Sequence, residues 1–395
     1  MRHKLRLLNL VLIVVFIFSF TACTTPKTTT EITTAETIIT ETTATVTTTE
    51  AKETATETTQ AEVKKEFSLS MVGNLYISGY TPTVWVEGDD AYLTSGDSFK
   101  IIDVSDKENP KILASVGMDI AGGYIGNDFC VKDNYAYIPY QVWDQKTNTT
   151  KESGFEVIDI GDKKNPKIVG GYKAKGQIIN IFIADKYIYV AFQVAEIKDN
   201  YYQVLESGFQ IVDITDKEKP NLVGEYSSKA QNGIGAVCAD GNLAYIFEDS
   251  YLKIIDVTNK DNLIEKGSLY LPIFSSNTLY FKDNYLYIPS ANALEIIDVS
   301  DKEKPTLAGG VFSKGGISKI FVLEDSVYIA YSIYLNSENN REVVESGLQI
   351  MDLKSSKLVG EIKVNGEAMG VFVSGDYAYV AAGPTGLQII KLFNE

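Results

Sequence analysis

Apolar and polar residues follow one short pattern that recurs seven times along the chain. A typical copy has an apolar strand that ends in aspartate, a polar turn and a second short apolar strand. The copies read FKIIDVSDKENPKIL, FEVIDIGDKKNPKIV, FQIVDITDKEKPNLV, LKIIDVTNKDNLIE, LEIIDVSDKEKPTLA, LQIMDLKSSKLVG and LQIIKLFNE. Repetition of strands and turns without a helical stretch is typical of an array whose units bury their faces against their neighbours. The pattern predicts an all-β repeat fold.

The third copy, residues 179–226, shows the content of one unit. It contains the segments IINIFIA, YIYVAFQV, GFQIVDIT and NLVGEY, separated by turns. Four consecutive strands joined by hairpins predict one antiparallel sheet, and the near-continuous apolar runs indicate that both of its faces are covered. We expect the first hairpin of every unit to be a two-residue turn with positive φ angles. These turns are predicted at Asp89-Asp90, Asp133-Asn134, Asp185-Lys186, Asp240-Gly241, Asp283-Asn284, Glu324-Asp325 and Gly375-Asp376.

The two ends of the repeat region complement each other. The seventh sheet stops after three strands at Leu392, while an extra strand, Phe67 to Val72 followed by Gly73, precedes the first unit. Donation of this strand to the last sheet would close a ring and remove its free edges. We therefore predict a seven-bladed β-propeller of four-stranded antiparallel blades, closed by the N-terminal strand. Complete sheets are expected to start near Val84, Phe129, Ile181, Val237, Leu279 and Ile320.

The IIDVSDKENP type of segment, together with YAYVAAGPTGLQII near the end, resembles the LVIVD repeat of secreted and surface proteins of bacteria and archaea. The resemblance covers about Glu66 to Glu395, although Lys391 replaces the motif aspartate in the last copy and the fourth copy lacks the proline. It implies a β-propeller on the cell surface. It implies no activity, because the family has no agreed catalytic or ligand motif.

The N-terminus is predicted to be an export signal. A basic start precedes an apolar core from Leu7 to Phe20, which is too short to span a bilayer comfortably. The segment from Phe20 to Cys23 resembles a bacterial lipobox, in which the cysteine is lipidated, although Phe20 departs from the usual aliphatic residue. Plain cleavage after Ala22 stays an alternative. Acyl chains on Cys23 would hold the protein at the outer side of the cytoplasmic membrane.

The chain therefore divides into three predicted regions. Residues 1–22 are the signal peptide and 63–395 the propeller. Residues 23–62 between them are rich in threonine and glutamate, and they contain almost nothing that could form a core. We expect a disordered tether whose ends lie roughly 35 Å apart. Whether its threonines carry sugars stays open.

The charged and titratable residues exclude several classes of function. The net charge of −16 disfavours nucleic acid as a partner. The only histidine, His3, lies in the leader, so Ser-His-Asp, Cys-His and histidine-ligated metal chemistry are excluded from the mature chain. We expect no enzymatic activity. The alternative is a carboxylate-dependent hydrolase or lyase that acts on envelope glycans at the channel mouth.

Two further sets of residues are predicted to be structural. Cys130 and Cys238 occupy one equivalent inner-strand position and are expected to be buried free thiols. An aspartate recurs before the polar turn and is expected to bind loop amides, at Asp103, Asp159, Asp213, Asp256, Asp298 and Asp352. Their spacing does not match a calcium loop. We expect no metal or other cofactor, with structural calcium left open.

Three long excursions, Val142 to Ser153, Val194 to Ser207 and Ser332 to Ser346, carry the main functional signal. Each connects the second and third strands of its unit and ends in Glu-Ser-Gly, so all three should extend from one face of the ring. The candidate binding residues in them are Trp143, Tyr201, Tyr202, Tyr334 and Arg341. The links between units should add Tyr80, Tyr124, Gln177, Asn232, Phe274 and Lys319 near the channel mouth. For any single residue, packing between hairpins is the alternative.

These residue types suit an extended peptide or a glycan. We therefore expect a lipid-anchored, extracellular and monomeric propeller. Its long-loop face would bind a cell-envelope protein or polysaccharide, and its lipid anchor would be its only contact with the membrane.

Overall fold

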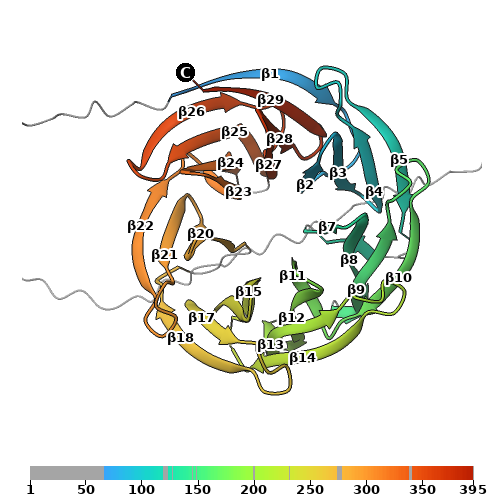
Figure 1. Ribbon diagram of the computed structural model, residues 1–395, viewed down its shortest axis with the longest axis vertical. Helices are drawn as coiled ribbons and strands as arrows, with labels where there is room; N and C mark the ends of the chain where they lie inside the picture. The colour runs from blue at the N-terminus through green and yellow to red at the C-terminus, as the bar shows by residue number, and fades with distance from the viewer. Residues whose placement is uncertain are drawn as a thin grey trace, which may run out of the picture. The chain divides into compact units, whose positions relative to one another are not determined.

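The computed structural model describes residues 66–118, 123–126, 128–144, 146–147, 149–198, 201–230, 232–273, 278–337 and 340–394. In these ranges the chain forms seven antiparallel sheets arranged as blades around a ring (Figure 1). The fold is a seven-bladed β-propeller. The predicted signal peptide, the tether and Cys23 lie outside the described residues. No helix in the described part of the chain could span a membrane.

The blades follow one another along the sequence, each with its innermost strand first. Blade 1 consists of β2 (Val84–Glu87), β3 (Asp90–Ser95), β4 (Ser98–Asp103) and β5 (Lys111–Gly117). Blade 2 consists of β6 (Gly123–Ile125), β7 (Cys130–Lys132), β8 (Tyr135–Asp144), β9 (Thr149–Asp159) and β10 (Lys167–Lys173). Blade 3 consists of β11 (Gln177–Ala184), β12 (Tyr187–Lys198), β13 (Tyr201–Asp213) and β14 (Asn221–Ser228). Blade 4 consists of β15 (Ile234–Asp240), β16 (Leu243–Glu248), β17 (Tyr251–Asp256) and β18 (Ile264–Tyr270).

The remaining three blades complete the ring. Blade 5 consists of β19 (Tyr280–Lys282), β20 (Tyr285–Ser290), β21 (Ala293–Asp298) and β22 (Thr306–Phe312). Blade 6 consists of β23 (Gly316–Leu323), β24 (Ser326–Ser337), β25 (Asn340–Asp352) and β26 (Lys357–Lys363). Blade 7 consists of β27 (Gly370–Ser374), β28 (Tyr377–Ala381), β29 (Leu387–Asn394) and β1 (Phe67–Leu75).

Blade 7 contains the predicted closure. Strand β1 pairs antiparallel with β29 from Phe67 opposite Asn394 to Leu75 opposite Leu387, and it forms the outer edge of the blade (Figure 1). A register shift between Met71 and Gly73 matches the bulges on the outer strands of the other blades. The two ends of the propeller are thus held in one sheet.

The core is divided among the blades. Among the described residues, seven clusters of buried apolar side chains each lie mainly between two neighbouring blades; one joins Tyr379 of blade 7 to Val84 of blade 1. Lysines of the polar turns add cation–π contacts between blades. The Nζ atom of Lys163 in blade 2 lies 5.0 Å from the ring centroid of Tyr92 in blade 1. The Nζ atom of Lys217 in blade 3 lies 5.7 Å from the ring centroid of Tyr137 in blade 2. The repeated D-K segment therefore fastens a blade to the preceding one.

Three local predictions were wrong. Both residues of the first hairpin turn have positive φ only in blades 2 and 5, whereas in the other five blades only the first turn residue does. The first hairpin turns of blades 1 and 4 are Gly88-Asp89 and Gly241-Asn242, one residue away from the predicted positions. Glycine takes the first turn position because it adopts positive φ without strain, here 61° and 54°. Blade 2 also differs, because its inner edge is made of two short strands, β6 and β7, which both pair with β8.

Candidate functional site

The three predicted excursions are long hairpins: β8–β9 in blade 2, β12–β13 in blade 3 and β24–β25 in blade 6. Each connects the second and third strands of its blade, so all three extend from the same face of the ring. The register shifts at an equivalent place in each, between Val142 and Trp143, between Val194 and Ala195, and between Ile333 and Tyr334. A bulge at the base bends each hairpin where it leaves its blade.

The Glu-Ser-Gly triplet marks the base of each hairpin for a steric reason. A Cβ atom on Gly208 would lie 1.9 Å from the carbonyl oxygen of Tyr226, and one on Gly154 would lie 2.1 Å from that of Tyr172. Side chains are therefore excluded where the third strand passes the fourth. The neighbouring hydroxyl of Ser346 donates to the carbonyl of Gly366, 2.5 Å away, and fixes the link to the next blade.

The glutamate of the triplet holds the base of the hairpin through ion pairs. Glu206 lies 2.6 Å from Lys175, and Glu345 lies 2.5 Å from Lys314 and 2.6 Å from Lys363. Hydrogen bonds from Lys314 and Lys363 lower the pKa of Glu345 to about 2. We conclude that the triplet is structural.

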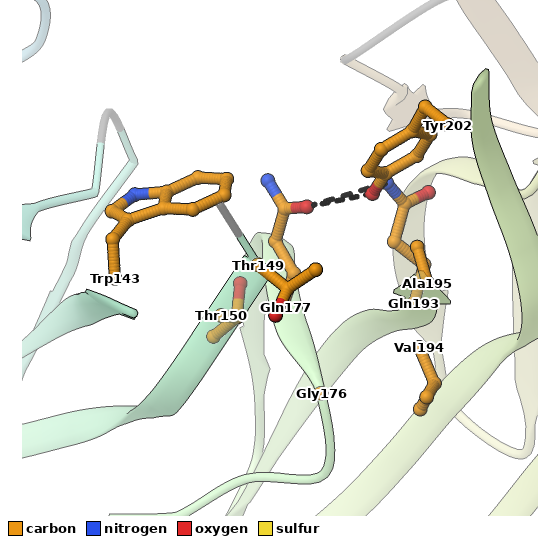
Figure 2. A pocket seen from close by; sticks show the side chains of 9 residues that line it. All are labelled: Trp143, Thr149, Thr150, Gly176, Gln177, Gln193, Val194, Ala195 and Tyr202. Carbon is orange, nitrogen blue, oxygen red and sulfur yellow. Dashed lines mark hydrogen bonds between the residues drawn. The ribbon is translucent and has the colours of Figure 1, made fainter. Parts of the chain in front are cut away.

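A cleft lies between the long hairpins of blades 2 and 3, and we call it the blade 2–3 cleft (Figure 2). Trp143 on β8 and Tyr202 on β13 stand on its two sides, with Gln177 of β11 between them. It has a volume of about 300 Å³, which includes the part open to solvent. It is lined by Trp143, Thr149, Thr150, Gly176, Gln177, Gln193, Val194, Ala195 and Tyr202. Three of the predicted binding residues meet here.

Tyr202 links the two glutamines of the cleft. Gln193 Nε2 donates to the Tyr202 hydroxyl at 2.7 Å, and that hydroxyl donates to Gln177 Oε1 at 3.0 Å. Gln177 is the first residue of the inner strand β11, and Gln193 lies just after the buried part of β12, so this network ties the hairpin to the inner strand. The orientations of both amides are thereby fixed.

Tyr334 and Arg341 belong to a second group, on blade 6. The Arg341 guanidinium carbon lies 3.5 Å from the ring centroid of Tyr334, whose hydroxyl donates to Glu367 Oε1 at 2.6 Å. Burial and this hydrogen bond raise the pKa of Tyr334 to about 12. Tyr80 joins the group from the β1–β2 link, with its hydroxyl 2.8 Å from Met369 Sδ. Blades 7 and 1 on one side, and blades 4 and 5 on the other, separate this group from the blade 2–3 cleft.

Lys319 lies on the inner strand β23 of blade 6 and forms an ion pair there. Its ammonium is 2.5 Å from Asp128 of blade 2, although two other blades separate their strands around the ring. Thr83 of the β1–β2 link donates to the same carboxylate at 3.5 Å. Both charged side chains are about one-fifth exposed, at 22% and 19%. The pair therefore joins inner residues of distant blades.

We expect the Asp128–Lys319 pair to couple these blades energetically. Asp128→Asn and Lys319→Met should each destabilise the fold by about 1–2 kcal/mol, because each leaves a partly buried charge unpaired. The double variant should recover about 1 kcal/mol of the summed loss. Urea unfolding of the four proteins measures this coupling, and strictly additive losses would show that the pair does not connect the blades.

The other predicted residues are dispersed. Tyr201 is 78% exposed at the tip of the blade 3 hairpin. Asn232 is exposed, and its backbone N–H donates to Asp249 at 2.6 Å. Tyr124 lies on β6, but its side chain is outside the described residues, as is all of Phe274. Gln193 and Asp128 were not among the residues predicted from the sequence. Gln193 continues an apolar strand, and Asp128 lies in an irregular link between β6 and β7, so no repeated sequence pattern marks either residue as part of a site.

The two cysteines and the repeat aspartates are held in structural settings. Cys130 and Cys238 are buried free thiols, and burial raises the pKa of Cys130 to about 12. Partial burial acts to raise the pKa of Asp213, but hydrogen bonds from Thr215 and Lys186 outweigh it and lower that pKa to about 2. A backbone N–H of the following turn likewise donates a hydrogen bond to the carboxylate of Asp103, Asp159, Asp256, Asp298 and Asp352. No cluster of three or more His, Cys, Asp or Glu in the described ranges could hold a metal ion.

Comparison with known sequences identifies the repeat. Five stretches match the LVIVD repeat: residues 78–117, 175–228, 235–270, 276–312 and 365–391. They fall on blades 1, 3, 4, 5 and 7, and they confirm the resemblance drawn from the seven copies. No curated protein matches the sequence.

Solved structures share the fold at low identity. The β-propeller domain of Cps50 (Swd1) from Myceliophteria thermophila has a TM-score of 0.59 at 13% identity, covering 82% of this chain and 100% of that one. The WD40 β-propeller domain of Doa1 has a TM-score of 0.58 at 9% identity, covering 82% and 97%. The computationally designed protein Ika8 has a TM-score of 0.53 at 10% identity, covering 81% and 99%. At these identities the likeness shows the propeller fold alone.

Proposed function

We propose that this chain, a β-propeller with LVIVD repeats, is a lipid-anchored binding protein of the cell surface. It recognises a cell-envelope protein or polysaccharide through the face that bears its three long hairpins. Cys23 carries the lipid, and residues 23–62 form the tether that holds the propeller outside the cytoplasmic membrane. The support for this part of the proposal is the pattern of the N-terminal sequence.

The observation that carries the binding role is the one-sided elongation of the blades. Three hairpins leave the same face, and two of them place aromatic side chains beside amide or charged groups. In blades 1, 4 and 5 a two-residue turn joins the same two strands, such as Asp249-Ser250 of blade 4. Extra length on one face of a repeat scaffold is typical of a binding surface.

We expect the fragment 63–395, which holds every described strand, to bind isolated cell envelopes. Replacement of Trp143, Tyr202 and Tyr334 together by alanine should weaken this binding at least tenfold, since exposed aromatic side chains dominate the energy of most binding surfaces. A sedimentation assay with labelled fragment measures the affinity.

The control replaces exposed aromatic residues away from the hairpins. Tyr285 follows the first hairpin turn of blade 5, and Phe393 lies near the end of β29; both are on the opposite face of the ring. Their alanine variants should bind as the parent does. Equal binding by the triple variant, with its thermal unfolding unchanged, would exclude the long-hairpin face.

A further inference from the structure

The blade 2–3 cleft is uncharged, in a chain of which 22% of the residues are charged. Its lining offers two aromatic rings, two glutamine amides, two threonine hydroxyls and small apolar groups. A charged ligand would lose its hydration there without gaining an ion pair, which is unfavourable. A neutral ligand with many hydroxyl groups would lose less hydration free energy and could replace it with hydrogen bonds to the lining. The lining therefore favours an uncharged polar ligand.

Gln177 presents a hydrogen-bond donor on the side of the cleft that Trp143 occupies (Figure 2). Its Oε1 atom accepts from the Tyr202 hydroxyl, so the amide cannot turn over without loss of that bond. Its Nε2 atom points away from Tyr202 toward the side of Trp143 (Figure 2) and donates to no acceptor among the described residues. A fixed donor of this kind selects for a hydroxyl or carbonyl acceptor.

Trp143 provides a ring surface on the opposite side. Its side chain is half-buried on β8, opposite Thr150 of β9, and the six-membered part of the indole is directed toward Gln177 (Figure 2). No ring contact or hydrogen bond within the described ranges occupies it. An indole held at the edge of a cleft and left without a ring partner can stack against the apolar face of a flat ligand.

We propose that the blade 2–3 cleft binds a neutral polysaccharide segment. A sugar ring stacks on Trp143, and its hydroxyl groups accept from Gln177 and exchange hydrogen bonds with Thr149 and Thr150. This inference rests on the proposed surface-binding function and names its ligand class. A sugar ring fits because it combines an apolar face with hydroxyl edges, as the cleft combines rings with amides. A peptide segment is the competing occupant, and titration with neutral oligosaccharides separates the two.

The test titrates the full chain with chitohexaose, cellohexaose and mannohexaose by isothermal calorimetry. We expect at least one of these neutral oligosaccharides to bind. Trp143→Ala should weaken its binding about tenfold or more, since a stacked ring is lost. Tyr202→Phe should weaken it about three- to tenfold, because the ring stays but Gln177 and Gln193 lose their shared hydroxyl.

Tyr201→Ala is the matched control. This residue is adjacent to Tyr202, is 78% exposed and does not line the cleft, so its loss should change the affinity less than twofold. If none of the oligosaccharides binds while envelopes are still bound and protease treatment of the envelopes removes that binding, the neutral-glycan inference is overturned and the surface-binding function stands. If envelopes are not bound at all, the proposed function itself fails.

Discussion

A chain that begins at Tyr76 instead of Val63 will lose the cooperative thermal unfolding of the propeller. It lacks β1, whose residues Phe67 and Leu69 pack into the core between blades 6 and 7, and Val72 and Leu75 into the core between blades 7 and 1. Burial of these four side chains contributes about 4 kcal/mol. The net stability of a domain is only about 5–15 kcal/mol, so the loss is a large part of the total.

The truncation also opens the ring. Without β1, strand β29 becomes an unpaired edge that can pair with another molecule, and we expect the truncated chain to form oligomers. Differential scanning calorimetry and light scattering report the two effects. A peptide of residues 66–75, added in trans, should restore part of the transition because it can occupy the vacant edge. A chain from Tyr76 that melts at the same temperature as the chain from Val63 would show that the closure is not needed.

Substitution of a single glycine on the outer strand of blade 7 should also weaken the closure of the ring, and a glycine of blade 5 provides the control. Gly73 and Gly309 occupy equivalent positions on outer strands, opposite Ile389 and Ile296. A Cβ on Gly73 would lie 1.9 Å from the carbonyl oxygen of Lys107 in blade 1, whereas a Cβ on Gly309 would have no atom within 4 Å. Gly73→Ala should therefore lower the melting temperature markedly. Gly309→Ala should leave it unchanged.

The fold could be predicted from the sequence because each blade repeats the same pattern of apolar strands and polar turns. The closure was also predictable, since the segment before Gly73 carries the pattern of an outer strand without an inner strand before it. The errors were local. Glycine moved the turns of blades 1 and 4 by one residue, and the entry to blade 2 is irregular enough to hold two short inner strands.

The site was predictable only in part. The common Glu-Ser-Gly triplet located the three hairpins, and three of the residues chosen from the hairpins and links line the blade 2–3 cleft. The pairing of Lys319 with Asp128 was not predictable, because 191 residues separate them and each belongs to a different repeat. Side-chain partners across a ring depend on its closure and on rotamers, and no pattern within one repeat specifies either of them.

The blade 3 hairpin can be removed by replacing it with the tight turn that blade 4 has at the same position. In blade 4 the second and third strands are joined by Asp249-Ser250, both with positive φ, between the paired residues Glu248 and Tyr251. The equivalent pair in blade 3 is Phe192 opposite Gly208. Replacement of residues 193–207 by Asp-Ser should therefore preserve the blade and remove one wall of the cleft. We expect envelope binding to fall at least tenfold.

The fold should survive this replacement with a modest loss of stability. The replaced segment includes Ser207, which donates to the buried carboxylate of Glu248 at 3.1 Å, but Ser228 and Lys253 also contact that carboxylate and would keep it paired. The matched control replaces residues 332–346 of blade 6, between Tyr331 and Gly347, in the same way. If the ligand occupies the blade 2–3 cleft, the blade 6 variant will retain most of its envelope binding while the blade 3 variant loses it. Unchanged binding by the folded blade 3 variant would exclude the cleft, because no ligand can use a wall that has been removed.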